Sequence, residues 1–298
     1  MKNIVLSFTL VTMLATISNN AMAQAAASAA TAARITVGDI TDSRTTGQFF
    51  KSLKIELKLS GDSVFDAYGI LTPDLTVAND DTGRSLLKEK DKNNKSALWN
   101  FHPRLNKSDT ENVTVELLNP ARKATSFTVK GTVSIYNPKL DANAVTAINN
   151  LPAIYGKEIK NDELKAAGIS LTVLNKETAV TAEKARMEEE KKKAAANPSG
   201  IMGSILNMAF GGTGNMDERT LQYLIKDPQN KLLYIEVTGA DGTAVSTRSR
   251  MHDSRDDVDS YAYSYDKPIT ADMTLKAYIA TPKSMMSVPL SVENTPLP

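Results

Sequence analysis

The stretch Leu53-Lys54-Ile55-Glu56-Leu57-Lys58-Leu59 alternates apolar and charged residues without a break. Successive side chains of a β-strand point to opposite faces, so this pattern places one face on a core and the other in water. Residues 113–117 (VTVEL) and 127–129 (FTV) repeat the alternation, and turn-forming Gly, Asn, Asp and Pro separate the runs. The sequence therefore predicts an all-β fold in which short antiparallel strands pack as a sandwich.

The C-terminal part of the chain repeats this layout of strands and turns. Three pairs of segments match in order and spacing: residues 77–83 with 237–242, residues 99–101 with 263–265, and residues 113–120 with 275–282, which sets Pro120 against Pro282. We therefore predict two related immunoglobulin- or fibronectin-like β-sandwich domains, residues 34–140 and residues 141–298. The alternative is that any two antiparallel sheets share such spacing.

Residues 178–217 differ from both repeats and are interpreted as an insertion between two strands of the second domain. Residues 181–196 (TAEKARMEEEKKKAAA) have high helix propensity, and Glu188 and Glu189 precede Lys192 and Lys193 by four residues, the favourable order for helix pairs. An apolar, Met-containing segment follows at residues 201–210, bounded by glycines. Its large side chains form a possible docking segment for a partner: Ile201, Met202, Ile205, Leu206, Met208 and Phe210. The alternative is that it folds back and covers a sheet edge.

The first 23 residues have the pattern of a secretory signal peptide. Lys2 supplies the positive charge, an apolar run follows, and Ala21-Met22-Ala23 forms a small-x-small cleavage site. We expect cleavage between Ala23 and Gln24, followed by a disordered leader at residues 24–33 and a periplasmic or secreted location. The apolar run is shorter than the roughly 20 residues that a membrane span needs, and we expect no transmembrane helix.

Charge and cysteine content narrow the possible partners. The chain has 35 Lys and Arg, 34 Asp and Glu, and no Cys; without residues 1–23 it loses Lys2 and no acid, which leaves 34 of each sign. A neutral protein has no electrostatic reason to bind nucleic acid. Without disulfides, burial of apolar side chains must stabilise the fold.

Two turn motifs carry a resemblance. Asp80-Asp81-Thr82-Gly83-Arg84 forms one motif, and Asn119-Pro120-Ala121-Arg122-Lys123-Ala124 forms the other. Together with Gly131 and residues 136–138 (YNP), they make residues 35–140 similar to a group of uncharacterised exported bacterial proteins. The resemblance implies a β-sandwich and assigns neither activity nor site residues. The second domain lacks the arginine equivalents.

The residues needed for common kinds of catalysis are sparse. His102 and His252 are the two histidines, and neither lies in a recognisable hydrolase motif. Arg122 and Lys123 could hold an acidic partner, although a solvated turn is the simpler interpretation. No cofactor-binding motif is present, because the glycines of residues 211–214 lack the lysine of a phosphate-binding loop.

Residues 252–259 contain a weak candidate for a metal site, since Asp253, Asp256, Asp257 and Asp259 place four carboxylates in a short run. The spacing differs from an EF-hand loop and Arg255 opposes a cation, so a solvated hairpin loop is favoured.

The alternating tyrosines of residues 261–265 face one side of a strand, where they could fill a core or stack on a sugar. Core filling is favoured, because Trp99 and Phe101 occupy the matching place in the other domain.

Three functions are compatible with these patterns. The first is an exported non-enzymatic envelope or secreted protein that binds another macromolecule, a protein or an envelope glycan, through its sandwich domains. The second is a carbohydrate-binding accessory module, which requires exposed rings at Tyr261, Tyr263 and Tyr265. The third is a hydrolase whose site no motif reveals. The absence of a catalytic motif favours the first.

Overall fold

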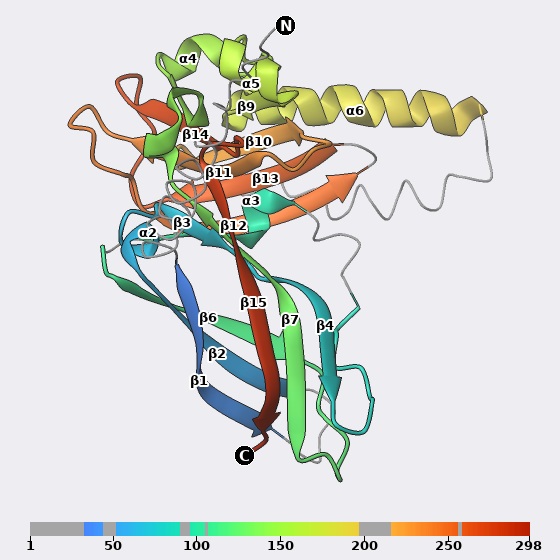
Figure 1. The fold of residues 1–298 in the computed structure, drawn as a ribbon. Helices are drawn as coiled ribbons and strands as arrows, with labels where there is room; N and C mark the ends of the chain where they lie inside the picture. Colours follow the sequence, from blue (N-terminus) through green and yellow to red (C-terminus); the bar gives the residue numbers. More distant parts are fainter. Residues whose placement is uncertain (1–32, 44–51, 90–95, 105–106, 197–215, 256–257) are drawn as a thin grey trace, which may run out of the picture.

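The computed structural model describes residues 33–43, 52–89, 96–104, 107–196, 216–255 and 258–298. The strands form four sheets in which neighbouring strands are antiparallel, and this confirms the predicted all-β class. Figure 1 shows the sheets in two halves, one above the other. The lower half contains strands β1 to β7 and β15, and the upper half contains strands β8 to β14.

Two sheets build the lower half. The first has the order β1-β2-β6, with β1 (Arg34–Ser43), β2 (Ser52–Ser60) and β6 (Thr110–Leu117). The second has the order β15-β7-β3-β5, with β4 also paired to β7; its strands are β3 (Gly69–Leu71), β4 (Asp74–Asp80), β5 (Phe101–Pro103), β7 (Ser126–Tyr136) and β15 (Met285–Pro296). The short helices α2 (Asp62–Phe65) and α3 (Ala97–Asn100) lie between strands along the chain.

Strand β2 carries the alternation on which the fold prediction rests. Its four apolar residues are buried, whereas Lys54 and Lys58 are exposed. Leu53 lies opposite Leu117 of β6, and Val129 of β7 belongs to the same core. Burying one such apolar side chain stabilises a fold by about 1.5–3 kcal/mol. The core of the lower half therefore follows from the period-two pattern.

The upper half also has two sheets. One has the order β12-β13-β10-β9, with β9 (Ser170–Leu174), β10 (Thr220–Lys226), β12 (Thr247–Arg255) and β13 (Val258–Tyr265). The other has the order β11-β14-β8, with β8 (Val145–Ile148), β11 (Leu232–Thr238) and β14 (Thr274–Ile279). The helices α4 (Leu151–Ile154) and α5 (Asp162–Ala167) precede β9 and lie at the top of the molecule in Figure 1.

The tyrosines of β13 fill the core of the upper half. Tyr261, Tyr263 and Tyr265 are each 1% exposed, and Tyr223 of β10 is fully buried beside them. The hydroxyl oxygens of Tyr223 and Tyr265 lie 2.5 Å apart, so one donates to the other. The prediction that these rings fill a core is confirmed, and the sugar-stacking surface that they would have formed is absent from β13.

Helix α6 (Lys176–Ala196) confirms the helix predicted at residues 181–196 and begins five residues earlier. It lies between β9 and β10, which are neighbours in one sheet, so the chain leaves the sheet and returns to the adjacent position. Figure 1 shows α6 extending well beyond the edge of that sheet. Residues 201–210, the possible docking segment, lie outside the described residues.

The last strand differs from the sequence-based division of the chain. The division assigns residues 285–296 to the second domain, whereas β15 pairs with β7 in the lower half along nearly its whole length. Val288 lies opposite Val133, and Val292 lies opposite Val129. The alternation of β15 by itself does not specify which sheet edge the strand joins. Strand pairing therefore decides where β15 belongs.

Helices in the described part of the chain are too short or too polar to cross a lipid bilayer.

Candidate functional site: the junction between the halves

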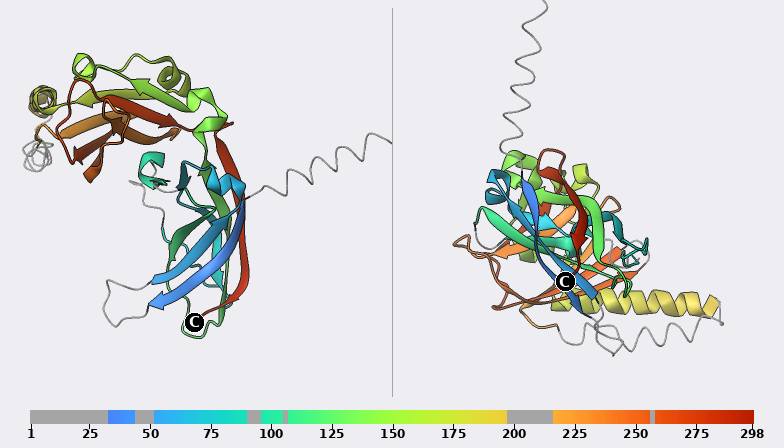
Figure 2. Two further views of the ribbon diagram at one scale, coloured as in Figure 1. Left: turned by 90° about the vertical axis from the view of Figure 1, so that its left-hand side faces the viewer. Right: turned by 60° about the horizontal axis from the view of Figure 1, so that its bottom comes forward.

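The two halves meet at an angle, and α3 lies inside this angle (Figure 2, left). α3 contacts β11 of the upper half, whereas the strand that follows it, β5, pairs with β3 of the lower half. Ala97 and Leu98 are buried there, and Leu98 belongs to the core of the upper half. The next residue, Trp99, keeps 43% of its surface exposed. The tryptophan of this chain is therefore partly accessible beside the buried residues of α3.

Aromatic rings from both halves pack together at the junction. Tyr68 of the lower half stacks on Tyr278 of the upper half, with ring centroids 4.4 Å apart. Phe101, Tyr136 and Tyr234 surround this pair at centroid distances of 5.7–6.4 Å from one another or from Tyr68. Such pairs contribute about 0.5–1.5 kcal/mol each beyond their buried area. The cluster therefore stabilises one relative orientation of the halves.

Glu236 of β11 joins the same two tyrosines through their hydroxyl groups. Tyr278 donates to Glu236 Oε2 at 2.8 Å, and Tyr68 donates to Glu236 Oε1 at 3.3 Å. Burial raises the pKa of both tyrosines well above the ordinary value, and the nearby carboxylate adds to the shift. Both hydroxyls therefore remain protonated donors throughout the physiological pH range.

Arg250 of β12 contacts one aromatic ring from each of the two upper sheets. Its guanidinium carbon lies 5.3 Å from the ring centroid of Tyr234 on β11 and 5.0 Å from that of Tyr263 on β13. A cation between two aromatic faces is attracted to both rings by about 0.5–2 kcal/mol per ring. Arg250 therefore anchors the inner face of β12, which is an edge strand, to the core.

His252 lies two residues further along β12 and on the same face. Its ring stacks on Tyr261 at 4.4 Å and on Trp99 at 6.0 Å. Its Nε2 atom lies 3.1 Å from Asp259 Oδ1, and burial raises the pKa of Tyr261 to about 12. The imidazole thus packs against two aromatic rings and one carboxylate. The arrangement suits a histidine that supports Trp99 from behind better than one that attacks or deprotonates a substrate.

Two of the four predicted metal ligands lie in the described part of the chain. Asp259 faces His252, Asp253 is exposed on β12, and Asp256 and Asp257 lie outside the described residues. Within the described ranges, His, Asp and Glu side chains form no group of three that could hold a metal ion. His102, the other histidine, lies 3.1 Å from the hydroxyl of Thr72, and burial lowers its pKa.

The two turn motifs interlock around Asp80, whose side chain is buried. Asp80 Oδ1 accepts hydrogen bonds from the backbone N–H groups of Thr82 and Arg84, both at 3.0 Å, and Oδ2 accepts from Ala121 N–H at 2.7 Å. Asp81 accepts from the Thr125 hydroxyl at 2.6 Å. The carboxylates of Asp80 and Asp81 thus connect the first turn to the second and stabilise the fold.

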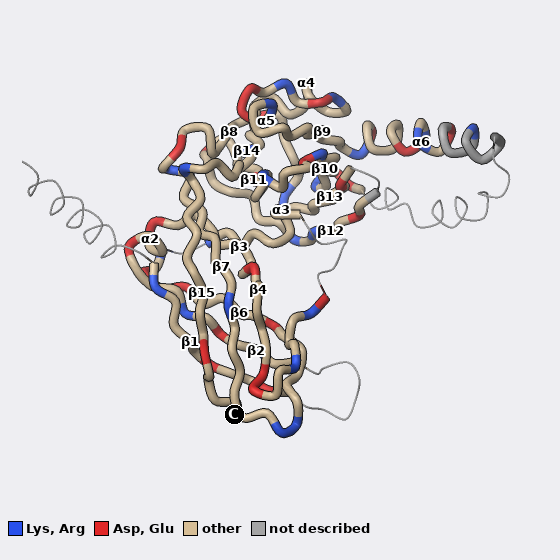
Figure 3. The backbone as a smooth tube through the Cα atoms, turned by 45° about the vertical axis from the view of Figure 1, so that its right-hand side comes forward, with Lys and Arg blue, Asp and Glu red and all other residues tan. Residues whose placement is uncertain are grey.

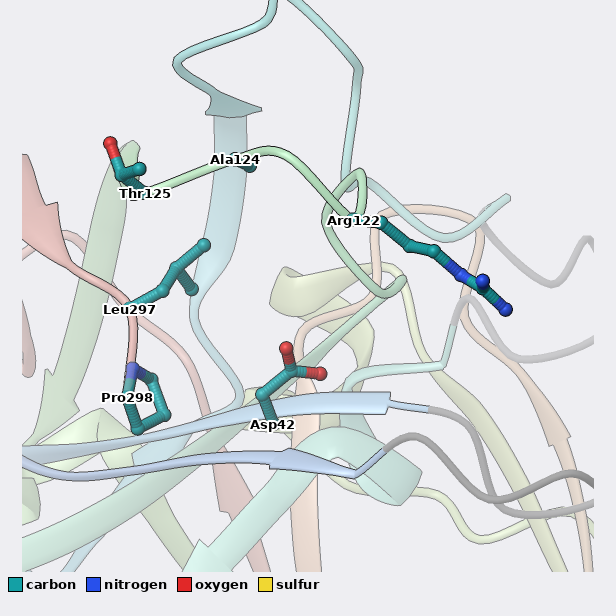
Figure 4. A pocket seen from close by; sticks show the side chains of 6 residues that line it. All are labelled: Asp42, Arg122, Ala124, Thr125, Leu297 and Pro298. Atoms are coloured by element: carbon teal, nitrogen blue, oxygen red, sulfur yellow. The ribbon is translucent and has the colours of Figure 1, made fainter.

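Two hollows lie in the surface of the described residues. One, of about 660 Å³, is lined at the far end of the lower half by Asp42, Arg122, Ala124, Thr125, Leu297 and Pro298. Figure 4 shows the Arg122 guanidinium pointing away from Asp42 and Leu297. Arg122 and Lys123 are exposed there, so the solvated-turn interpretation fits the structure. The other hollow, of about 420 Å³, lies beside α5.

Sequence reasoning missed Tyr68, Glu236, Arg250 and Tyr278. Arg250 and Glu236 occur in alternating strands, where charged residues ordinarily face water. The signal that could have located them is the contact of β11 and β12 with residues of the lower half, such as Tyr68 with Glu236 and Trp99 with His252, which no local pattern reveals.

The chain matches no known family model, no curated protein and no solved structure.

Proposed function

We propose that the protein is exported and acts without catalysis, by binding an extended polypeptide segment along β12 in the angle between its halves. The observation that carries the proposal is the position of β12. This nine-residue strand forms one edge of its sheet, where it pairs with β13 on one side. An edge strand offers backbone N–H and C=O groups to an incoming strand.

The inner and outer faces of β12 favour such a role. On the inner face, Arg250 and His252 hold the strand against aromatic rings. The strand is therefore already ordered, and it loses little conformational entropy on binding. On the outer face, Ser249 and Met251 are exposed, and Met251 keeps 66% of its surface accessible. A rigid strand with accessible side chains is suited to adding a partner strand.

Trp99 supplies an anchor beside this edge. It belongs to α3, which lies in the same angle (Figure 2), and its ring stacks on His252 at 6.0 Å. Tryptophan is enriched among the interface residues that contribute most to binding, because it buries a large area with few rotatable bonds. Basic and acidic residues are interspersed over both halves (Figure 3), which supports a polypeptide ligand rather than nucleic acid.

Two further points belong to this proposal. We infer that each half is an immunoglobulin-like sandwich, because each packs two antiparallel sheets around one apolar core. Export rests on residues 1–23, which lie outside the described residues. An intact-mass measurement on the periplasmic or secreted protein should give a chain that begins at Gln24. Recovery of Met1 in the soluble cytosolic fraction would contradict export.

Site-specific photo-crosslinking tests the binding surface. A photoreactive residue at Met251 should capture a polypeptide from envelope extract. The same residue at Leu140, which is similarly exposed at 60% but lies outside the angle, is the matched control. Trp99→Ala should lower the yield at Met251 by about tenfold, the effect of losing a typical anchor. Equal capture at both positions, or an unchanged yield without Trp99, would contradict binding at β12.

A further inference from the structure

Two turns, one in each half, have the same backbone hydrogen bonds. In the lower half, Asp80 N–H donates to Arg84 C=O at 3.0 Å, Gly83 N–H to Asp80 C=O at 3.0 Å, and Leu86 N–H to Ala78 C=O at 2.7 Å. In the upper half, the same three bonds link Gly239 with Thr243, Gly242 with Gly239, and Val245 with Val237, at 2.8–2.9 Å. Every atom pair is displaced by 159 residues, as positions 80 and 239 are.

The strand pairings extend this correspondence to whole sheets. In the lower half β1 pairs with β2 and β2 with β6; in the upper half β9 pairs with β10 and β10 with β13. The turn above follows β4 in one half and β11 in the other, and these strands pair with β7 and β14. Five strands therefore correspond in the same chain order, which supports duplication of one unit.

The corresponding strands also correct two of the sequence matches. β14 pairs with β11 as β7 pairs with β4, so β14 corresponds to β7 rather than to β6. Pro282 after β14 then corresponds to Pro138 after β7, not to Pro120. Likewise β13 corresponds to β6, whereas residues 99–101 lie in α3 and β5.

The sixth strand of each unit is exchanged between the halves. After β7 the chain forms β8, and after β14 it forms β15. β8 pairs with β14 rather than with β7, and β15 pairs with β7 rather than with β14. Both pairings are antiparallel, so β8 occupies in the upper half the place that β15 occupies in the lower half. The two crossover segments touch where they pass, since Asn137 N–H donates to Ser284 C=O at 2.8 Å.

We propose that a second copy of this chain can make the same exchange, giving a dimer in which β15 of each molecule pairs with β7 of the other. Every contact of β15 with the lower half would then be reproduced, including the burial of Val288, Leu290 and Val292. Pro289 lies in the exposed face of β15 and is suited to an edge strand, which disfavours simple edge-to-edge addition. Reciprocal exchange instead forms a closed pair.

Concentration decides between the two arrangements. Within one molecule, the five residues 280–284 hold β15 close to β7 at an effective concentration of the order of 1 mM. The dimer should therefore form when β15 is released and the protein is concentrated, as in refolding from denaturant at about 1 mM. Refolding at about 1 µM should return the monomer.

The absence of native Cys permits a direct test by mixed disulfides. Lys130 and Ser291 are exposed partners in the β7–β15 register. Chains carrying Lys130→Cys and differently tagged chains carrying Ser291→Cys are refolded together at about 1 mM and oxidised, so that the mixed disulfide requires β15 of one molecule on β7 of another. The control replaces Ser291→Cys by Ser249→Cys on exposed β12, which exchange leaves far from residue 130.

The proposal expects a mixed disulfide at least about tenfold above the control at 1 mM, and near the control at about 1 µM. A second pair, Ser134→Cys with Ser287→Cys, repeats the test with nearly isosteric replacements, so that a misfolded first variant does not decide the result. Circular dichroism verifies that each variant refolds. Yields equal to the control for both pairs of folded variants would overturn the exchange between molecules.

Discussion

The corresponding turns of the two halves have one backbone and two different ways of stabilising it. In the lower turn, buried Asp80 caps the N–H of Arg84 and also reaches Ala121 in the neighbouring turn. In the upper turn, Gly239 stands in the place of Asp80, and exposed Asp241 caps the N–H of Thr243, the counterpart of Arg84, at 3.0 Å. The turn therefore needs an acceptor for the N–H of Arg84 or of its counterpart Thr243. The accepting carboxylate can stand at the position of Asp80 or at that of Asp241.

The largest difference between the halves should appear when the two carboxylates are removed. Asp80→Ala removes the acceptor of three backbone N–H groups, those of Thr82, Arg84 and Ala121, so the free energy of unfolding should fall by about 3 kcal/mol. Asp241→Ala exposes its N–H group to water, so the loss should be much smaller. Urea unfolding of both variants measures the difference. Equal losses would show that the link from Asp80 to the second turn contributes nothing to stability.

Acid should weaken the lower turn through the same carboxylate. Burial raises the pKa of Asp80, but hydrogen bonds from Ala121, Thr82 and Arg84 outweigh burial, so the pKa lies below the ordinary 3.8. A lowered folded-state pKa means that this stabilisation is present above pH 3.8 and is lost as the pH falls below that value. Unfolding measured from pH 6 to pH 2.5 should therefore show a shallower acid loss in Asp80→Asn than in the parent. An unchanged pH profile would contradict this role.

The glycines of the two turns should behave alike. Gly83 has φ +84° and Gly242 has φ +77°, a region that side chains rarely adopt, and a Cβ at either position would meet open space. Conformational strain alone should therefore make Gly83→Ala and Gly242→Ala each lose about 1–2 kcal/mol of unfolding free energy. Thermal unfolding of both variants checks this. Clearly unequal losses would indicate that the two backbones are not equivalent.

The connections between the first two strands of each unit should show the smallest effect. Residues 44–51 join β1 to β2, whereas residues 175–219 join β9 to β10. Of the described residues in the longer connection, Ala179 and Met216 are buried against Leu174. Replacing residues 178–217 by a short Gly/Ser linker should cost about 1 kcal/mol and leave one cooperative thermal transition, because the shorter loop offsets part of the lost burial of Met216.

A second variant, which keeps the buried contacts with Leu174, tests whether those contacts account for the loss of stability. Keeping residues 176–180 and Met216 while replacing only residues 182–214 should recover the stability of the parent, because the buried contacts with Leu174 remain. Unfolding of the upper half in both variants would mean that the segment belongs to the core.

Local periodicity was sufficient to predict the strands, the helix and the buried tyrosines. The alternation of β2 and of residues 261–265 records which face of a strand is apolar, and a fold that buries that face follows from it. The helix at residues 181–196 was predictable because propensity and charge spacing act within a few residues. The turn of residues 237–242 was matched correctly because its glycine marks a position with positive φ.

The sequence by itself determined which residues face a core and where turns occur, because these properties depend on neighbours along the chain. Only the tertiary structure decided that β8 and β15 are exchanged, since an alternating strand fits any complementary sheet edge and its partner is more than a hundred residues away. The junction arose in the same way. Arg250, Glu236 and Trp99 contact residues of segments that are distant in the sequence. The free energy of that packing depends on the tertiary structure, so no local sequence pattern predicts it.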